Sequence, residues 1–265
     1  MAKLYIVGTP IGNLQDITLR AIDTLKSVDV IACEDTRHSL PLLNKYDIHA
    51  KLISYHKFNE AECSGKIIEL INDEQNVALI SDAGMPSISD PGAELIARCR
   101  EYGVETELVP GPTAVASAIT LSGIKASGFT FLGFLPEKKS DKANILSKAA
   151  MSGLPIVIYV APHDLTKTAS TLLEILGDRT VHIVREITKL YESVTTCTLS
   201  NFSCEERGEM VMIIEGIGAE NPLNTLTVQE HIEHYVSLGM DKKEAVKQVA
   251  KDRGVPKNEI YKFTI

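Results

Sequence analysis

The sequence lacks the features of secreted, metal-binding and membrane-spanning proteins. Its five cysteines are odd in number, scattered and free of C-x-x-C pairs, so we expect neither a disulfide framework nor a zinc site. No apolar run approaches the ~18 residues that a membrane-spanning helix needs. Residues 1–3 lead directly into an apolar segment, without a signal-peptide pattern. These absences predict a cytoplasmic protein in a reducing compartment, with no metal and no membrane contact.

The sequence also lacks the basic excess that is typical of proteins that coat nucleic acids. It has 27 Lys and Arg against 35 Asp and Glu, a net charge of −8. An RNA enzyme is still compatible with this charge, because phosphate contacts need only a local basic patch. Residues 241–257 offer one, with six Lys or Arg against three acidic residues. A solvated helix surface would also explain that segment.

Composition and patterning predict an α/β protein of one or two domains. Hydrophobic residues make up 44% of the chain and charged residues 23%, as in ordinary globular proteins. In the first 122 residues, short apolar runs alternate with stretches whose apolar residues recur every three or four positions. The runs are 4–7, 28–32, 77–80 and 104–109, and the helical stretches are 19–28, 59–72 and 91–102. This alternation predicts a parallel sheet in an N-terminal domain, 1–122.

A Gly- and Ser-containing stretch at 122–128 marks the expected start of a second domain, 123–220. Its expected strands are 129–134, 155–160, 181–184, 191–198 and 209–215, with a helix at 140–150. The later gaps are too short for a helix between every pair of strands, so this sheet should be mixed. A Gly/Pro/Asn-rich linker at 216–224 and helices at 228–238 and 242–252 predict a small helical segment, 225–265.

Three turns follow strands of the N-terminal domain at their carboxyl ends. We name them the first turn (8–13), the second turn (81–86) and the third turn (110–114). Ligands of open parallel sheets bind outside the carboxyl ends of strands, so the three turns predict one pocket. Ordinary strand-to-helix turns also favour Gly and Pro, which is the alternative interpretation.

The pocket does not have the pattern of a phosphate cradle. The first turn lacks the G-x-G-x-x-G spacing, Pro10 removes a backbone donor, and no G-x-x-x-x-G-K-[ST] loop occurs in the chain. Acidic residues surround the predicted pocket: Glu34, Asp35, Asp82 and Asp90. They favour a ligand with ribose hydroxyls and positive charge. For Asp90 a structural role is the alternative, because Asp90–Pro91 could cap the helix that follows.

Six segments resemble the tetrapyrrole methylase superfamily, and within it the branch of ribosomal RNA methyltransferases. They are residues 4–14 (LYIVGTPIGNL), 32–37 (ACEDTR), 81–92 (SDAGMPSISDPG), 133–136 (GFLP), 185–189 (REITK) and 208–211 (GEMV). The resemblance implies a two-domain α/β enzyme, usually a homodimer, that binds S-adenosylmethionine between its domains. It further implies 2′-O-methylation of a cytidine in the 16S rRNA of the small ribosomal subunit.

The resemblance also implies the site residues. The expected cofactor contacts are Pro10, Ser81, Asp82, Ala83, Gly84, Met85, Thr113, Ala114, Tyr159 and Gly216. Asp35, Thr36, His163 and Arg185 would face the substrate, and Glu34, Arg37, Glu186 and Lys189 would be catalytic.

A ribose hydroxyl needs a base to take its proton, so we expect Glu34, Glu186 or Lys189 in that role. Arg37 and Arg185 would hold phosphates. Structural roles are the alternatives: Glu34 and Asp35 could cap the next helix, and Arg185 and Glu186 could form an ion pair.

The second domain departs from the family pattern at residues 159–164. Val160 stands where an acid is usual, and Asp164 stands where a cation is usual. An apolar cleft there would suit a methylase of a tetrapyrrole or another small molecule. A non-catalytic protein that docks on the ribosome through residues 242–257 is a third hypothesis.

Overall fold

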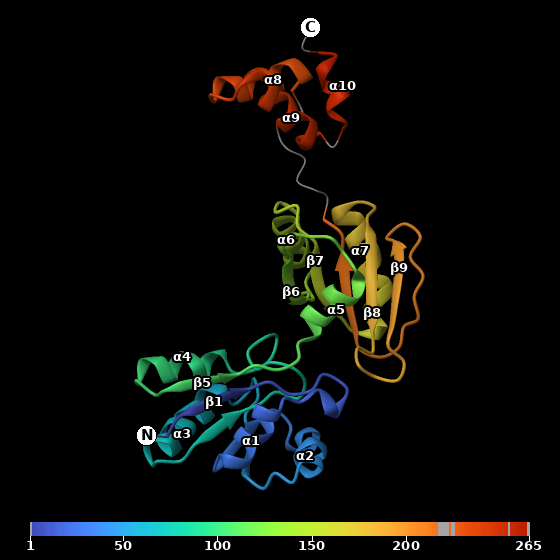
Figure 1. Cartoon of the computed structure of the whole chain (residues 1–265). Helices are drawn as coiled ribbons and strands as arrows, with labels where there is room; N and C mark the ends of the chain where they lie inside the picture. Colours follow the sequence, from blue (N-terminus) through green and yellow to red (C-terminus); the bar gives the residue numbers. More distant parts are fainter. Residues whose placement is uncertain (1, 217–222, 224–225, 254, 264–265) are drawn as a thin grey trace.

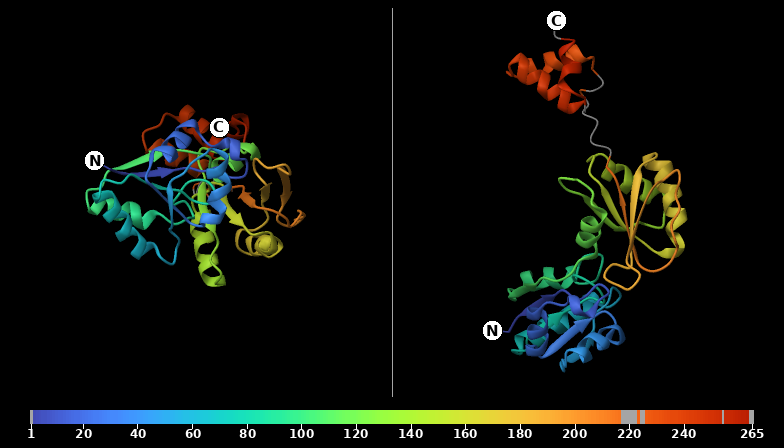
Figure 2. Two further views of the ribbon diagram at one scale, coloured as in Figure 1. Left: turned by 90° about the horizontal axis from the view of Figure 1, so that it is seen from below. Right: turned by 45° about the vertical axis from the view of Figure 1, so that its right-hand side comes forward.

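The computed structural model describes residues 2–216, 223, 226–253 and 255–263. Two five-stranded sheets follow each other along the chain, and a group of C-terminal helices comes after them (Figure 1). The two sheets form separate layers with their own helices, as the views of Figure 2 show. The expected α/β fold is therefore confirmed.

The first sheet is parallel throughout, as the alternating pattern predicts, and has the strand order β3-β2-β4-β1-β5. Its strands are β1 (Leu4–Val7), β2 (Val30–Cys33), β3 (Lys51–Ser54), β4 (Val77–Leu79) and β5 (Thr106–Val109). Helices α1 (Leu19–Ser27) and α2 (Thr36–Lys45) cover one face, while α3 (Glu60–Asn72) and α4 (Ala93–Glu101) cover the other. Because β4, β1 and β5 are neighbours, the turns after them share one edge of the sheet.

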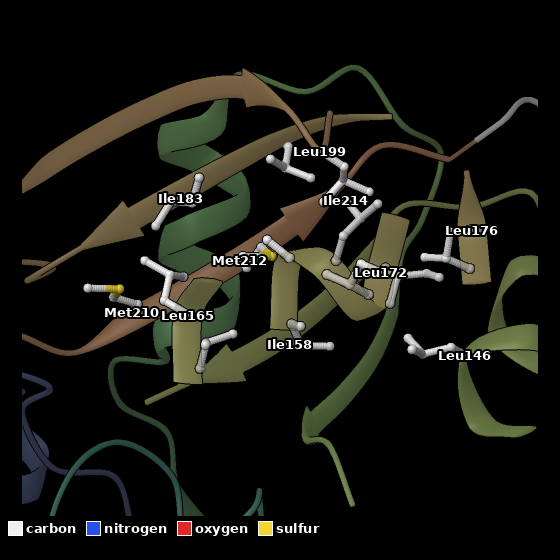
Figure 3. Close-up of a cluster of buried hydrophobic side chains, with 14 of the residues drawn as sticks. Leu146, Ile158, Leu165, Leu172, Leu176, Ile183, Leu199, Met210, Met212 and Ile214 are labelled. Carbon is white, nitrogen blue, oxygen red and sulfur yellow. The ribbon is translucent and has the colours of Figure 1, made fainter. Parts of the chain in front are cut away.

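The second sheet is mixed, as expected, with the order β6-β7-β10-β8-β9. Its strands are β6 (Thr130–Phe134), β7 (Ile156–Val160), β8 (Thr180–Arg185), β9 (Ser193–Thr198) and β10 (Met210–Ile214). Among its described strand pairs, β6–β7 is parallel and the others are antiparallel. Helices α6 (Lys139–Ala150) and α7 (Leu165–Leu176) cover one face, where the strands and α7 enclose a buried aliphatic cluster (Figure 3).

Helix α5 (Ala114–Ser122) links the two sheets and covers the other face of the second one (Figure 1). Its Val115 and Ala118 are buried together with Val157 and Val184 of β7 and β8. The expected domain boundary at 122/123 coincides with the end of α5, although the helix packs on the second sheet. The domain limits stay a prediction.

Three C-terminal helices form a small core of their own: α8 (Val228–Ser237), α9 (Lys242–Asp252) and α10 (Lys257–Tyr261). Ile232, Val246 and Ile260 are buried between them. Apart from Gly216 and Leu223, the expected linker at 216–224 lies outside the described residues. None of the described helices is both long and apolar enough to cross a membrane.

Candidate active site

The three turns predicted to form one pocket are in direct contact. The Thr9 N–H donates to the Gly84 carbonyl (2.9 Å) and the Gly84 N–H donates back to Thr9 (3.2 Å), which joins the first and second turns. A Cβ on Gly8 would lie 2.7 Å from backbone atoms of Gly111, so the first and third turns touch as well. Glycine at both positions permits this backbone approach.

An open cavity of about 380 Å³ lies beside these turns, between the two sheets. This volume is within the range of about 300–1,000 Å³ that is usual for cofactor and small-molecule sites. One wall comes from the three turns and the loop after β4, and the other comes from β6, β7, β10 and the segments that follow β7 and β8.

Most of the expected cofactor residues meet at this cavity. Its wall includes Ala83, Gly84, Met85, Thr113, Ala114 and Tyr159. Ser81 is buried behind the wall, where its hydroxyl donates to the Gly84 carbonyl (3.2 Å) and shapes the second turn. Pro10 precedes the wall residue Ile11.

Gly216 does not join this group. It follows the end of β10, whereas the cavity is lined by Met210 and Val211 at the start of that strand. Gly216 lies instead in a second concavity with Ser122 and His182. Gly216 therefore does not contact a ligand that is bound in the first cavity.

Further wall residues come from the second sheet: Phe134 was not expected from the sequence, whereas Val160 and Ala161 lie where an apolar cleft was expected. Phe134, from the GFLP segment, is 63% exposed and stands edge-on to Tyr159 with ring centroids 5.4 Å apart. Val160, Ala161 and Pro162 extend the apolar wall beyond Tyr159. Phe134 is the last residue of β6, and this place at a strand end is the sequence signal that could have identified it.

Asp90, one of the acidic residues expected around the pocket, lines the cavity, and the alternative that it caps a helix is wrong. The N-cap of α4 is Gly92, at φ +136°, so the helix begins later than Asp90–Pro91 suggests. Within the same loop Ser87 and Ser89 have φ values of +65° and +63°. Backbone strain of this kind concentrates at functional sites.

Three carboxyl groups gather at this end of the first sheet: Glu34, Asp82 and Asp90, which we call the acidic group. Burial, with the nearby charges of Glu34 and Asp82, raises the pKa of Asp90 to about 6. Burial and Asp82 also raise the pKa of Glu34. Asp82 is tied to the start of α2, since its carboxylate accepts from the Asp35 N–H (3.2 Å) and contacts His38 Nδ1 (3.0 Å). Neither Glu34 nor Asp82 belongs to the cavity wall.

The start of α2 presents the remaining ACEDTR residues. Asp35 caps this helix by accepting from the Arg37 N–H (2.8 Å), so the expected capping role is confirmed for Asp35. The Arg37 guanidinium pairs with the same carboxylate (2.7 Å) and is 85% exposed. Hydrogen bonds from Arg37 lower the pKa of Asp35 to about 2. Thr36 occupies the first helical position.

The REITK segment forms ion pairs, but not the expected one. Arg185 pairs with Glu205 (2.8 Å), whereas Lys189 lies between Glu186 (3.2 Å) and the wall residue Glu209 (3.1 Å). The Glu209 N–H donates to Glu186, and this bond, assisted by Lys189, lowers the pKa of Glu186. Burial opposes the charge on Lys189, but its two carboxylate partners outweigh burial and raise its pKa.

The same segment joins the two halves of the molecule. The Thr188 hydroxyl accepts from the Asn13 N–H (3.0 Å), and a Cβ on Gly12 would lie 2.7 Å from the Lys189 side chain. His163 is in a short helical turn (Pro162–Asp164) that follows β7, with its Nε2 3.5 Å from the Asp164 carboxylate.

No group of His, Cys, Asp or Glu in the described part of the chain is arranged to hold a metal.

The arrangement suits a ligand that is largely apolar, carries positive charge and enters between the sheets. Apolar and aromatic side chains form most of the wall, and Asp90 adds a carboxylate. The substrate-side candidates lie outside the wall itself, at the start of α2, in the REITK segment and, for His163, in the turn after β7.

Comparison with known proteins agrees with this architecture. Residues 3–203 match the family "Tetrapyrrole (Corrin/Porphyrin) Methylases". Ribosomal RNA small subunit methyltransferase I of Bacillus subtilis is 45% identical, over 98% of this chain and 93% of the relative. The protein of the same name from Escherichia coli O157:H7 is 35% identical, over 99% and 94%.

Solved structures show the same fold at lower identity. The methyltransferase CobJ superposes with a TM-score of 0.64 at 17% identity, over 82% of this chain and 95% of that one. Uroporphyrin-III C-methyltransferase from Thermus thermophilus, complexed with S-adenyl homocysteine, superposes with a TM-score of 0.59 at 20% identity, over 82% and 98%. The chain belongs to the tetrapyrrole methylase family and, within it, to the ribosomal RNA small subunit methyltransferase I family.

Proposed function

We propose that this protein transfers a methyl group from S-adenosylmethionine to the 2′-hydroxyl of a cytidine in the 16S rRNA of the small ribosomal subunit. The observation that carries this proposal is the cavity, because it brings the first, second and third turns together with β7 and β10 around one ligand-sized space. The names of the 35–45% identical relatives support a ribosomal RNA substrate.

The wall fits S-adenosylmethionine. Apolar side chains such as Ile11 and Met85 suit its carbon skeleton, and Tyr159 and Phe134 offer aromatic surfaces to its adenine. The Asp90 carboxylate suits its positive charge. Ala83, Gly84, Thr113 and Ala114 are small enough to let a ligand approach the backbone. When bound, the cofactor supplies an electrophilic methyl group on a sulfonium.

The RNA would approach from the side of α2. The Arg37 guanidinium projects into solvent there, next to His38, and Asp82 raises the pKa of His38. The charged Arg37 guanidinium at a helix start suits phosphate contact. Lys189 also retains its charge, although it is occupied by two carboxylates.

The candidate bases differ in how freely they could accept a proton. Glu186 is a poor choice, since it is fixed by the Glu209 N–H and Lys189 and its pKa is lowered. Lys189 is a poor choice because its raised pKa keeps it protonated. Of the three groups expected from the sequence, Glu34 remains, with a raised pKa.

A pair of alanines on α5 tests the cofactor site directly. Ala114 lines the cavity, whereas Ala116 is exposed two residues further along the helix. Ala114→Phe should weaken S-adenosylmethionine binding at least about tenfold, because the ring would occupy ligand volume. Ala116→Phe is the matched control and should bind normally. Equal affinities by titration calorimetry would place the cofactor elsewhere.

The substrate class is tested by methyl transfer from labelled S-adenosylmethionine. Acceptors would be small ribosomal subunits that lack 2′-O-methylation, free 16S rRNA, and a tetrapyrrole. Label in RNA supports the proposal and shows which RNA form is used. Label in the tetrapyrrole alone would favour the small-molecule alternative, for which the apolar Val160–Ala161 wall is suited. Binding without transfer would favour a docking protein. The homodimer stays a prediction that sedimentation would test.

A further inference from the structure

We propose that Asp90 is a catalytic residue that accepts the proton of the ribose 2′-hydroxyl as the methyl group is transferred. This inference rests on the proposed function and adds a role for a residue that neither the motif assignment nor the capping interpretation explains. Of the three residues of the acidic group, only Asp90 lines the described cavity.

The structure leaves the Asp90 carboxyl available. Among the described residues it has no hydrogen-bond or ion-pair partner, whereas Asp82 is engaged by His38 and the Asp35 N–H. Gly92, not Asp90, caps α4, so local structure makes no demand on the side chain. The Asp90 carboxyl is half-buried, lines the cavity and has no structural role of its own, and titratable groups in such positions mark functional sites.

The surrounding backbone fixes Asp90 in place. The Gly92 N–H donates to Glu60 Oε1 (2.9 Å), and the Ser87 N–H donates to the Pro91 carbonyl (3.1 Å), so both ends of the loop are held. Ser89 abuts Gly133 of β6, where a Cβ would lie 2.6 Å from the Ser89 hydroxyl. The carboxyl is therefore positioned by both halves of the molecule.

The charges around Asp90 suit proton transfer near neutral pH. From the first sheet, Glu34 and Asp82 add to burial and raise its pKa to about 6. From the second sheet, Asp90 in turn contributes to the raised pKa of the Tyr159 hydroxyl, after burial. Glu209, also in the wall, is paired with Lys189. A base with a pKa just below neutral is ionised yet retains useful basicity.

The transfer is balanced in charge as well as in atoms. The ribose oxygen forms a bond to the methyl carbon, the carbon–sulfur bond breaks with its electron pair kept by sulfur, and the hydroxyl proton passes to Asp90. A carboxylate facing a sulfonium becomes a carboxylic acid facing a neutral thioether. No net charge is created inside the cavity, where an uncompensated charge would be expensive.

The first test measures the carboxyl group without relying on turnover. In ¹³C-labelled protein, the Asp90 carboxyl resonance, assigned with Asp90→Asn, should titrate near pH 6. S-adenosylmethionine should lower that midpoint more than S-adenosylhomocysteine does, because only the former is positively charged. A midpoint near 4, or an equal response to both ligands, would overturn the proposal.

The second test is single-turnover methyl transfer as a function of pH. The wild-type rate should rise and level off as Asp90 ionises, and Asp90→Asn should be about 10²–10⁴-fold slower without that inflection. Asp90→Glu should recover part of the rate. Glu34→Gln should move the inflection to lower pH, because it removes a charge that raises the pKa of Asp90.

The outcomes separate the two proposals. A fully active Asp90→Asn variant, or a large loss confined to Glu34→Gln, would overturn the role of Asp90 while the proposed function stood. A wild-type protein that methylates no RNA, despite binding the cofactor, would overturn the proposed function and with it the ribose as the source of the proton.

Discussion

At the residue scale, Asp90 shows how a functional carboxyl costs stability. Its pKa is raised from 3.8 to about 6, chiefly by burial. As pH rises from about 4 to about 6, the unfolded chain ionises this group before the folded protein does, so ionisation favours the unfolded state. The free energy of unfolding therefore falls over that window. At neutral pH the ionised Asp90 destabilises the folded protein.

Asp90→Asn should accordingly stabilise the protein at pH 8. We expect a gain of about 1–2 kcal/mol after allowance for solvent screening, seen as a rise of a few degrees in the unfolding temperature. At pH 4 the gain should largely vanish. Asp23→Asn, on the exposed face of α1, controls for the change in net charge. Equal effects of Asp90→Asn at both pH values would contradict the assigned environment.

The sequence predicts the position of some site residues but not the partners of others. The turn residues Ala83, Gly84 and Thr113 were placed at the cavity correctly, since strand-end geometry follows from the pattern. For Asp90 the alternative capping role failed, because Asp–Pro is a common helix start and nothing local shows that the loop continues to Gly92. The partners of Arg185 and Glu186 depend on Glu205 and Glu209, which only the folded sheet brings close.

At the scale of elements, the contact between the loop after β4 and strand β6 holds the site together. Gly133 has a φ of +63° and leaves no room for a side chain beside Ser89. The register of the β6–β7 pair shifts between Phe131 and Gly133, so the strand is irregular at this contact. Two halves that are separate in sequence meet there.

Gly133→Ala should therefore disturb the active site more than the fold. The new Cβ would push Ser89 and its neighbour Asp90 away, and displacements of about 1 Å cost up to 10²-fold in rate. We expect methyl transfer to fall at least about tenfold, together with a modest loss of stability. Gly123→Ala is the matched control, since Gly123 has a similar φ of +67° and its Cβ would meet nothing within 4 Å. Indistinguishable rates for the two variants would show that the contact between Gly133 and Ser89 does not position Asp90.

The elements most easily read from the sequence were those with strong periodicity. Strands β1 and β4 and helix α3 were found within two residues of their ends. Strand β3 was missed because it lies at the sheet edge and has only two apolar residues, Leu52 and Ile53, between polar ones. Helix α2 contains Pro41, which hides its pattern. The packing of α5 on the second sheet is a tertiary contact that no local pattern reveals.

At the scale of the whole molecule, the C-terminal helices supply the basic surface that the net charge conceals. Lys243, Lys247 and Lys251 recur every four residues and are exposed on one face of α9. Arg253, by contrast, donates to His231 Nδ1 (3.3 Å) and to the Leu226 carbonyl, so it stabilises the helices internally. The sequence predicted the basic segment without distinguishing these roles.

Neutralising this face should weaken RNA binding. The triple variant Lys243→Gln, Lys247→Gln, Lys251→Gln should bind small-subunit RNA less tightly, with a salt-dependence slope smaller by about 0.7 for each phosphate that is no longer neutralised. Its cofactor affinity should not change. The exposed Lys26, Lys51 and Lys66 of the first sheet and its helices provide a control triple of equal charge away from α2. Equally weakened binding by both triples would mean that net charge, not the α9 face, governs binding.

The most direct test of the account identifies the methylated nucleoside. Small subunits that lack 2′-O-methylation would be incubated with the protein and S-adenosylmethionine, and their RNA digested to nucleosides for mass spectrometry. The account predicts one new product, 2′-O-methylcytidine, that is absent when Ala114→Phe blocks the cavity. A methyl group on a base, or no methylated nucleoside despite cofactor binding, would contradict it.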